Sequence, residues 1–126
     1  MEITVTIEPH ERAAWRLWLE QNHEQATEIW LIYQQRSEGG ITYLDIVEEA
    51  LCFGWVDGLA KKYDANRTAQ RLTPRWARSN WTELNKERVR RLIREGLMTP
   101  AGRTRKNEMF GNWDDTGPAR TATRTS

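Results

Sequence analysis

The sequence is poor in the residues that build redox and metal sites. It has one cysteine, Cys52, and two histidines among 126 residues. A single cysteine excludes an internal disulfide, which is typical of proteins in the reducing cytoplasm. So few cysteine and histidine side chains make an ordinary zinc site hard to assemble, and we therefore expect no metal.

Long hydrophobic runs and catalytic signature motifs are also absent. No apolar stretch approaches the roughly 20 residues of a membrane helix, and the N-terminus lacks the basic start and apolar segment of a signal peptide. There is no internal repeat, no glycine-rich phosphate loop and no nucleophile elbow. These absences favour a cytoplasmic protein without a cofactor, and they leave an enzymatic function without support from a motif.

Tryptophan, in contrast, is plentiful, with seven copies in a chain that is 38% apolar. This content predicts a folded core rather than disorder. The length fits one domain, which we expect to span residues 1–113. Residues 114–126 have no hydrophobic periodicity and are expected to form a disordered tail.

The net charge of +1 conceals a division of charge along the chain. Residues 1–60 hold three arginines, no lysine and eleven acidic residues, whereas residues 61–126 hold sixteen basic and seven acidic residues. We favour the interpretation that the two halves attract each other, within the fold or across a homodimer. The alternative is a basic face that binds an anionic partner.

The first forty residues alternate between strand and helix patterns. Residues 2–7 alternate apolar and polar side chains and predict a short strand. Pro9 suits the first turn of a helix that runs to about Asn22. Residues 28–35 are aromatic and β-branched and predict a buried strand, with a turn at 37–40. One side of this helix is predicted to hold Ala14, Leu17, Trp18 and Gln21, with Trp15 and Leu19 beside them.

A second helix is predicted to begin after Thr42, which forms a capping pair with Asp45. Its apolar stripe places Glu48 and Glu49 on the other side, and Gly54 is expected to end it. The residues of the stripe are Tyr43, Ile46, Val47, Ala50 and Leu51.

The remaining pattern predicts a hairpin followed by a helix. Residues 55–63 and 68–73 read as its two strands, and Pro74 ends the second one. A helix capped by Ser79 or Thr82 extends to Glu95, and Thr99-Pro100 predicts another helix start. The stripe of the capped helix is Leu84, Val89, Leu92 and Ile93. The sequence thus predicts an α+β fold, with a small antiparallel sheet of three or four strands packed against two or three helices.

Arginine and lysine alternate with aromatic residues between Gly54 and Trp81, as in sites that bind phosphate and a stacked base. We favour a ligand-binding role for Arg71 and Arg75, and a core role for Trp55 and Trp81. Asp57 is interpreted as an ion-pair partner of Arg71, with a general base as the alternative. The full set of predicted ligand-binding residues is Arg71, Arg75, Asp57, Arg78, Ser79, Trp55, Trp81 and Lys61, and catalytic residues are not assigned.

Four ordered strings cover about residues 3–115, namely EIWLIYQQRS, ITYLDIVEEALCFGWVDG, RLTPRWARSNWTELNKERVRRLIREGLMTPAG and GNWD. Through them the chain resembles the bacterial YdeI/OmpD-associated, or bacteriocin-protection, family. The resemblance implies a cytoplasmic bacterial protein linked to tolerance of antimicrobial peptides and bacteriocins. It carries over no catalytic residue, because the family's molecular activity is not established. The motif residues are Cys52, Gly54, Trp55, Asp57, Gly58, Arg71, Thr73, Pro74, Arg75, Ser79, Trp81, Asn85, Arg88, Met98, Thr99 and Pro100.

The sequence differs from the family pattern in two respects. Trp76-Ala77 follow Thr73-Pro74-Arg75, where the family usually has another basic or proline residue. Many members also continue into a C-terminal helical domain after the equivalent of Trp113.

Three functions are consistent with these patterns. The first is a stress-protection protein that acts as a non-enzymatic binding module for an anionic ligand or nucleic acid, through the Arg- and Trp-rich surface. The second is protection against cationic peptides through a protein partner, which the acidic half would attract. The third is an enzyme with a pocket around Asp57, Arg71 and Arg75.

Overall fold

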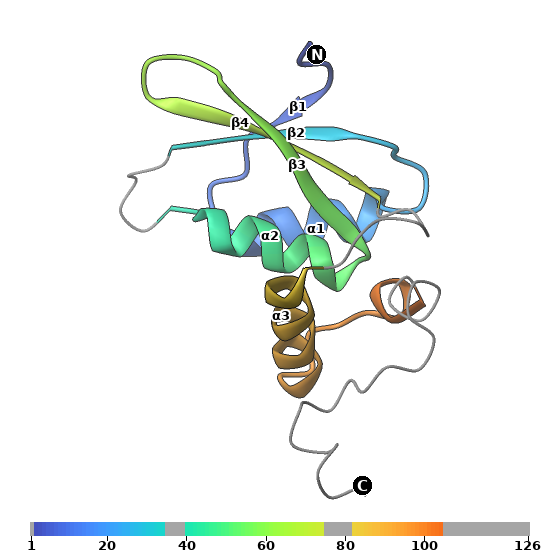
Figure 1. Ribbon diagram of the computed structural model, residues 1–126. Helices are drawn as coiled ribbons and strands as arrows, with labels where there is room; N and C mark the ends of the chain where they lie inside the picture. The colour runs from blue at the N-terminus through green and yellow to red at the C-terminus, as the bar shows by residue number, and fades with distance from the viewer. Residues whose placement is uncertain (1, 35–39, 75–81, 105–126) are drawn as a thin grey trace, which may run out of the picture.

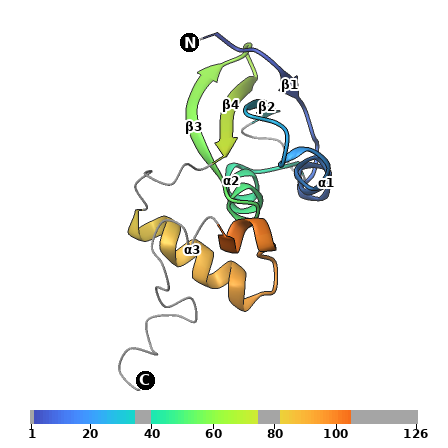
Figure 2. The same ribbon diagram turned by 90° about the vertical axis from the view of Figure 1, so that its right-hand side faces the viewer.

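The computed structural model describes residues 2–34, 40–74 and 82–104 as a sheet with helices on one of its faces (Figure 1). Figure 2 shows α1 and α2 beneath the sheet and α3 on the far side of α2. A further helical turn spans residues 100–104. The elements are β1 (Thr6–Ile7), α1 (Arg12–Asn22), β2 (Ile29–Gln34), α2 (Tyr43–Cys52), β3 (Trp55–Lys62), β4 (Arg67–Pro74) and α3 (Glu83–Arg94).

The sheet has the strand order β1-β2-β4-β3 and confirms the α+β class and the predicted hairpin. β4 pairs antiparallel with both β2 and β3, but β1 pairs parallel with β2. The sheet is therefore mixed rather than wholly antiparallel. The reason lies in the connection, because α1 carries the chain from the end of β1 back to the start of β2.

Both faces of the central strand β2 are covered, as its continuous apolar run predicted. On the helix side, Ile29, Leu31 and Tyr33 join the main core. On the outer side, Trp30 and Ile32 form a small second cluster, the other members of which are Ala69 and the partly buried Ile3. Alternate residues of the sheet therefore belong to two separate apolar layers.

α1 begins later than the sequence predicted, and fewer of its residues are buried. It starts at Arg12 instead of near Pro9, because Glu11 takes the extended N-cap conformation. Trp15 and Leu19 are its buried residues, whereas Leu17 is 52% exposed. The expected burial of Leu17 is wrong, because only the side of α1 that bears Trp15 and Leu19 faces the core.

α2 confirms its predicted ends. Thr42 and Asp45 form a reciprocal capping box, and Gly54 follows the helix with a φ of 77°. Glu48 and Glu49, which the pattern places off the apolar stripe, are nevertheless buried, at only 3% and 2% exposure. The sequence pattern identified one apolar stripe, but α2 is enclosed by the sheet on one side and by α1 and α3 on the others.

Arginines from both flanking helices neutralise the two buried carboxylates. Glu49 accepts hydrogen bonds from Arg12 and Arg16 of α1. Glu48 accepts from Arg12 at 3.2 Å and from Arg91 of α3. Burying a carboxylate is tolerated only with such partners, because the desolvation cost is several kcal/mol per ion, on the order of the gain from pairing.

Ion pairs also join the acidic and basic halves of the sequence. Glu48 binds Arg91, Glu28 binds Arg71, and Glu8 binds Arg67. The favoured interpretation, that the halves attract each other, is confirmed within the fold.

The segment after α3 folds back onto the end of α2. The backbone N–H and the hydroxyl of Thr99 donate to the carbonyl of Cys52, at 3.0 and 2.6 Å. The Thr99 hydroxyl also caps the helical turn at 100–104 by accepting from the N–H of Gly102, which confirms the predicted helix start. A Cβ at Gly102 would lie 2.3 Å from the Cys52 carbonyl oxygen, so only glycine permits this approach.

Some predictions fall on residues outside the described ranges, namely the turn at 37–40 except for Gly40, and the tail at 114–126. Among the described residues, no helix is both long enough and apolar enough to cross a membrane.

The Glu49 ion pairs yield a stability prediction. Glu49→Ala should lower the free energy of unfolding by about 3 kcal/mol, because it removes the buried carboxylate that the partly buried Arg12 and Arg16 share. Glu20 provides a matched control, since it is exposed and lies 3.6 Å from the same Arg16. Glu20→Ala should cost at most about 1 kcal/mol. Equal losses for both variants in urea unfolding would contradict the role of burial.

The contact at Gly102 yields a second prediction. Gly102→Ala should destabilise the protein by about 1–3 kcal/mol, because the added methyl group collides with the Cys52 backbone. Thr104→Ala, an exposed change in the same turn, should stay within about 0.5 kcal/mol. Unfolding followed by tryptophan fluorescence measures both, and an unchanged Gly102→Ala stability would refute the docking of this turn.

Candidate functional site

A groove opens between β3 and the start of α2, on the helix side of the sheet. In Figure 1 the β3–β4 hairpin extends beyond the first turn of α2. The volume of the groove is about 560 Å³, within the usual range of ligand sites. The residues that line it are Tyr33, Thr42, Tyr43, Asp57, Gly58, Ala60, Thr68 and Gln70.

Asp57 and Tyr43 form the principal polar contact in the groove. The Tyr43 hydroxyl donates to Oδ2 of Asp57 at 2.6 Å. Burial raises the pKa of Tyr43 to about 12, aided by the hydrogen bond to Asp57 and by its negative charge, while Arg88 acts in the opposite direction. The phenol is therefore held in its protonated, donating form, and Asp57 is held at a fixed position above α2.

Gln70 shapes the floor of the groove. It is buried in β4, and its side-chain amide group donates to the carbonyls of Gly58 at 2.8 Å and Arg71 at 3.2 Å, with a longer contact to Leu59. The pairing of β3 with β4 shifts register between Asp57 and Ala60, which is the mark of a bulge. The Gln70 amide supplies donors to carbonyls that the bulge removes from the regular ladder.

The first turns of α3 lie close to this site. Thr82 caps the helix by accepting from the N–H of Asn85, which decides between the two caps that the sequence allowed. The Arg88 guanidinium donates to Oδ1 of Asn85 at 3.0 Å, and its charge acts on Tyr43. Asn85 is buried, although the sequence had assigned Leu84 to the buried stripe. Leu84 is instead 60% exposed, because the buried face of α3 is formed by Asn85, Val89 and Leu92.

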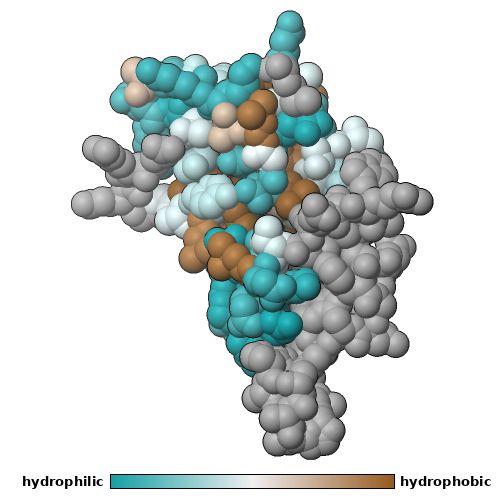
Figure 3. Space-filling model, in the orientation of Figure 1, coloured by the Kyte–Doolittle hydropathy of each residue, from teal (hydrophilic) through white to brown (hydrophobic). Residues whose placement is uncertain are grey.

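Exposed apolar side chains adjoin the groove. Figure 3 shows brown and pale surface that runs from β3 across the start of α2 towards the start of α3, between hydrophilic regions above and below. The large exposed apolar side chains of these elements are Leu59 on β3, Tyr43 and Leu44 on α2, and Leu84 on α3. Such a patch beside a groove is typical of an interaction site.

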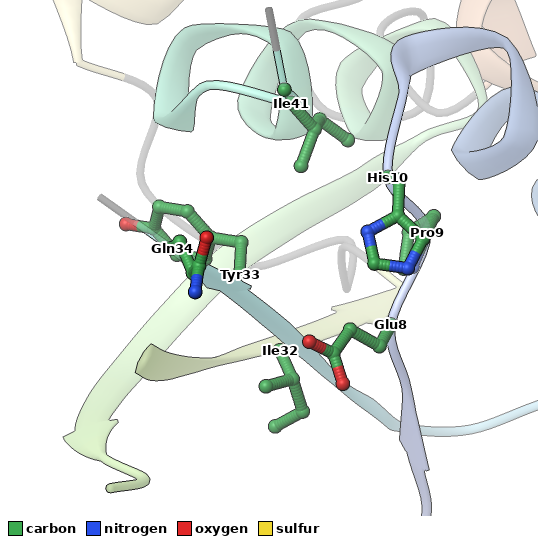
Figure 4. Close-up of a pocket in the computed structure, with 8 residues that line it drawn as sticks. Glu8, Pro9, His10, Ile32, Tyr33, Gln34 and Ile41 are labelled. Carbon is green, nitrogen blue, oxygen red and sulfur yellow. The ribbon is translucent and has the colours of Figure 1, made fainter. Parts of the chain in front are cut away.

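Two other cavities are smaller. One, of about 120 Å³, is lined by Glu8, His10, Tyr33 and Gln34 among others, and Figure 4 shows Glu8 and His10 facing Tyr33 and Gln34 across it. The Glu8 carboxylate in this cavity is already bound to Arg67 at 2.7 Å. The other, of about 380 Å³, lies beside the helical turn at 100–104.

Among the described residues, no group of histidine, cysteine and acidic side chains could hold a metal ion.

The structure divides the predicted ligand-binding residues. Asp57 lies in the groove, whereas Trp55, Arg71 and Lys61 do not line it. The other four, Arg75, Arg78, Ser79 and Trp81, lie outside the described residues.

Trp55 is a core residue, and its predicted contact with a ligand stays a prediction. It is 1% exposed, and its ring meets Trp18 edge-on with ring centroids 5.9 Å apart. The favoured assignment of Trp55 to the core is thereby confirmed. Trp55 also lines the cavity of about 380 Å³ beside the helical turn at 100–104.

Arg71 lies on the outer face of the sheet, and its predicted pairing with Asp57 is wrong. It sits opposite Trp30, and its guanidinium donates to Glu28, whose pKa is lowered by hydrogen bonds from Thr4 and Arg71. Asp57 pairs in register with Leu72, the neighbour of Arg71, and neighbours on a strand point to opposite faces. A pocket that combines Asp57 with Arg71 therefore does not form.

Lys61 shares the outer face with Arg71. It pairs in register with Ala69, two residues before Arg71. Alternation along β4 places Arg67, Ala69 and Arg71 on this outer face and Gln70 on the opposite one, in agreement with the two separate apolar layers, which contain Ala69 and Leu72 respectively.

Sequence reasoning missed Tyr43, Tyr33 and Gln70 as site residues. Tyr43 and Tyr33 fit apolar patterns and were assigned to the core on that basis. Gln70 is the sequence feature that could have pointed to the site, because it is a lone amide in a strand between the apolar residues Ala69 and Leu72. A polar side chain that is buried in this way needs hydrogen-bond partners nearby.

The Tyr43–Asp57 contact yields a titration prediction. Asp57→Asn should lower the pKa of Tyr43 from about 12, because the charge that opposes ionisation is lost. The pKa should remain above the ordinary 10.0, because burial is the largest cause of the shift. NMR titration of the tyrosine ring carbons measures it, with Asp64→Asn, an exposed change in the hairpin turn, as the control. A Tyr43 pKa that does not respond to Asp57→Asn would contradict the contact.

Comparison with known families matches residues 7–105 to a family described as a domain of unknown function (DUF8412). No curated protein and no solved structure matches the chain significantly. The matched range includes every strand and helix of the fold except the first residue of β1, and it contains the whole groove. The chain therefore belongs to the DUF8412 family of domains of unknown function.

Proposed function

We propose that this domain is a non-enzymatic binding module that holds a segment of a polypeptide partner in the groove between β3 and α2. The observation that carries the proposal is the groove itself, with its Tyr43–Asp57 pair and the exposed apolar side chains beside it. A peptide segment matches both features, because it offers apolar side chains together with hydrogen-bonding groups.

The positions of the basic side chains favour a polypeptide over a nucleic acid. Arg71 is bound to Glu28, and Arg67 is bound to Asp64 and Glu8. A phosphate would have to displace these carboxylates before it could pair with either guanidinium. Binding of an anionic ligand through Arg75 and Arg78 stays a prediction, since both lie outside the described residues.

The chemistry of the described nucleophiles favours binding over catalysis. Burial raises the pKa of the Cys52 thiol to about 11, so the reactive thiolate is scarce near neutral pH. The Asp57 carboxylate contacts the Tyr43 phenol, whose raised pKa makes it a poor proton donor to a substrate.

The proposal also agrees with what the resemblance to the bacteriocin-protection family implies. Protection against antimicrobial peptides or bacteriocins would follow if the groove binds a segment of such a peptide, or of a protein partner. We propose this role as the biological context of the binding module.

A peptide-display experiment tests the proposal. Peptides selected from a random library should bind the wild-type domain, and Ala60→Trp, which fills the groove, should weaken them at least about tenfold, or about 1.4 kcal/mol. Ala13→Trp adds the same side chain at an exposed position of α1 and should leave binding unchanged.

Two results would contradict the proposal. One is a set of selected peptides that bind Ala60→Trp as tightly as the wild type. The other is tight binding of single-stranded DNA or RNA that falls steeply with salt and is insensitive to Ala60→Trp, which would favour the basic surface instead.

A further inference from the structure

We infer that the groove selects a cation, namely the guanidinium or ammonium group of an arginine or lysine side chain in the bound segment, with Asp57 as its anchor. This inference rests on the proposed function and adds the chemical class of the ligand.

The first support is the charge of the groove. Asp57 is the one charged side chain among the eight residues that line it. The buried or partly buried carboxylates Glu48, Glu49 and Glu28 are each neutralised by arginine. Asp57 differs from them, because it takes part in none of the ion pairs formed among the described residues, and its contact is a neutral hydroxyl. A negative charge in a concave site attracts a cation.

The second support is the direction of the hydrogen bonds. The Tyr43 proton is donated to Asp57, and the Gln70 amide group donates to backbone carbonyls within the sheet. The donors of Tyr43 and Gln70 are thus engaged inside the protein, whereas the Asp57 carboxylate can only accept hydrogen bonds from a ligand. A guanidinium or ammonium group consists of donors alone, whereas a carboxylate or phosphate consists of acceptors.

The third support is the aromatic and apolar wall. Tyr33 and Tyr43 line the groove, and Leu59 is exposed on the strand that carries Asp57. Arginine and lysine have an apolar stem and a charged end, so the stem can pack on such side chains while the end reaches a carboxylate. The guanidinium of Arg67 over the Tyr63 ring, at 5.0 Å, shows the same packing elsewhere in this fold.

A positive charge on α3 opposes a bound cation. Arg88 of α3 acts on Tyr43, but it donates to Asn85 and is not among the residues that line the groove. The anchor is therefore the carboxylate of Asp57, on the β3 side of the site.

The test compares three acetylated pentapeptides that differ only at their centre, which holds arginine, its neutral isostere citrulline, or glutamate. Leucines flank the central residue to match the apolar surroundings of the groove. Each peptide is titrated into the ¹⁵N-labelled full chain at low salt, and the amide signals of the groove residues are followed. The arginine peptide should bind at least about tenfold more tightly than the citrulline peptide, and the glutamate peptide most weakly.

Two variants locate the preference. Asp57→Asn should abolish the difference between arginine and citrulline, whereas Glu24→Gln, which removes an exposed carboxylate after α1, should preserve it. Because arginine and citrulline are compared on one protein, the preference can be judged even if a variant is less stable.

The outcomes separate the two proposals. Equal binding of the arginine and citrulline peptides at the groove, or a preference that survives Asp57→Asn, would overturn the inference while leaving the binding module intact. No change of the groove signals with any of the three peptides would overturn the inference and argue against peptide binding at this groove as well.

Discussion

The buried carboxylates of α2 set the arrangement of the helical layers. Glu48 and Glu49 are almost fully buried, and arginines reach them from α1 on one side and from α3 on the other. Their desolvation is unfavourable unless those arginines are in place, so the pairing favours one mutual position of the three helices. The apolar contacts around Trp15 and Leu92 then pack within that arrangement.

The same arrangement produces the groove. With α2 held against the sheet, its capped first turn presents Tyr43 to Asp57 of β3. The bulge after Asp57 interrupts the pairing with β4, and Gln70 satisfies the carbonyls that the interruption leaves. Site residues from four elements thus converge, and the Tyr43–Asp57 and Gln70–Gly58 contacts join residues that are 14 and 12 positions apart in the sequence.

The acidic and basic halves of the chain are paired with each other in the fold. Three ion pairs join the acidic half to the basic half, and they occupy Arg67, Arg71 and Arg91. In the described part of the second half, the positive charges of these three arginines are therefore neutralised by carboxylates of the first half. The Asp57 carboxylate remains outside these pairs, which is why the groove, rather than the hairpin arginines, is our candidate for ligand binding.

The sequence by itself determined the local features: the α+β class, the capping box at Thr42 and Asp45, the glycine after α2, the hairpin, and the helix start at Thr99. Each depends on residues within a few positions of one another, so propensity and spacing suffice to predict it. Only the tertiary structure decided that Glu48 and Glu49 are buried, that Arg71 binds Glu28, and that Tyr43 meets Asp57. A charged side chain is buried or exposed according to which distant partner packs against it, and a periodic pattern records the apolar stripe without recording the partner.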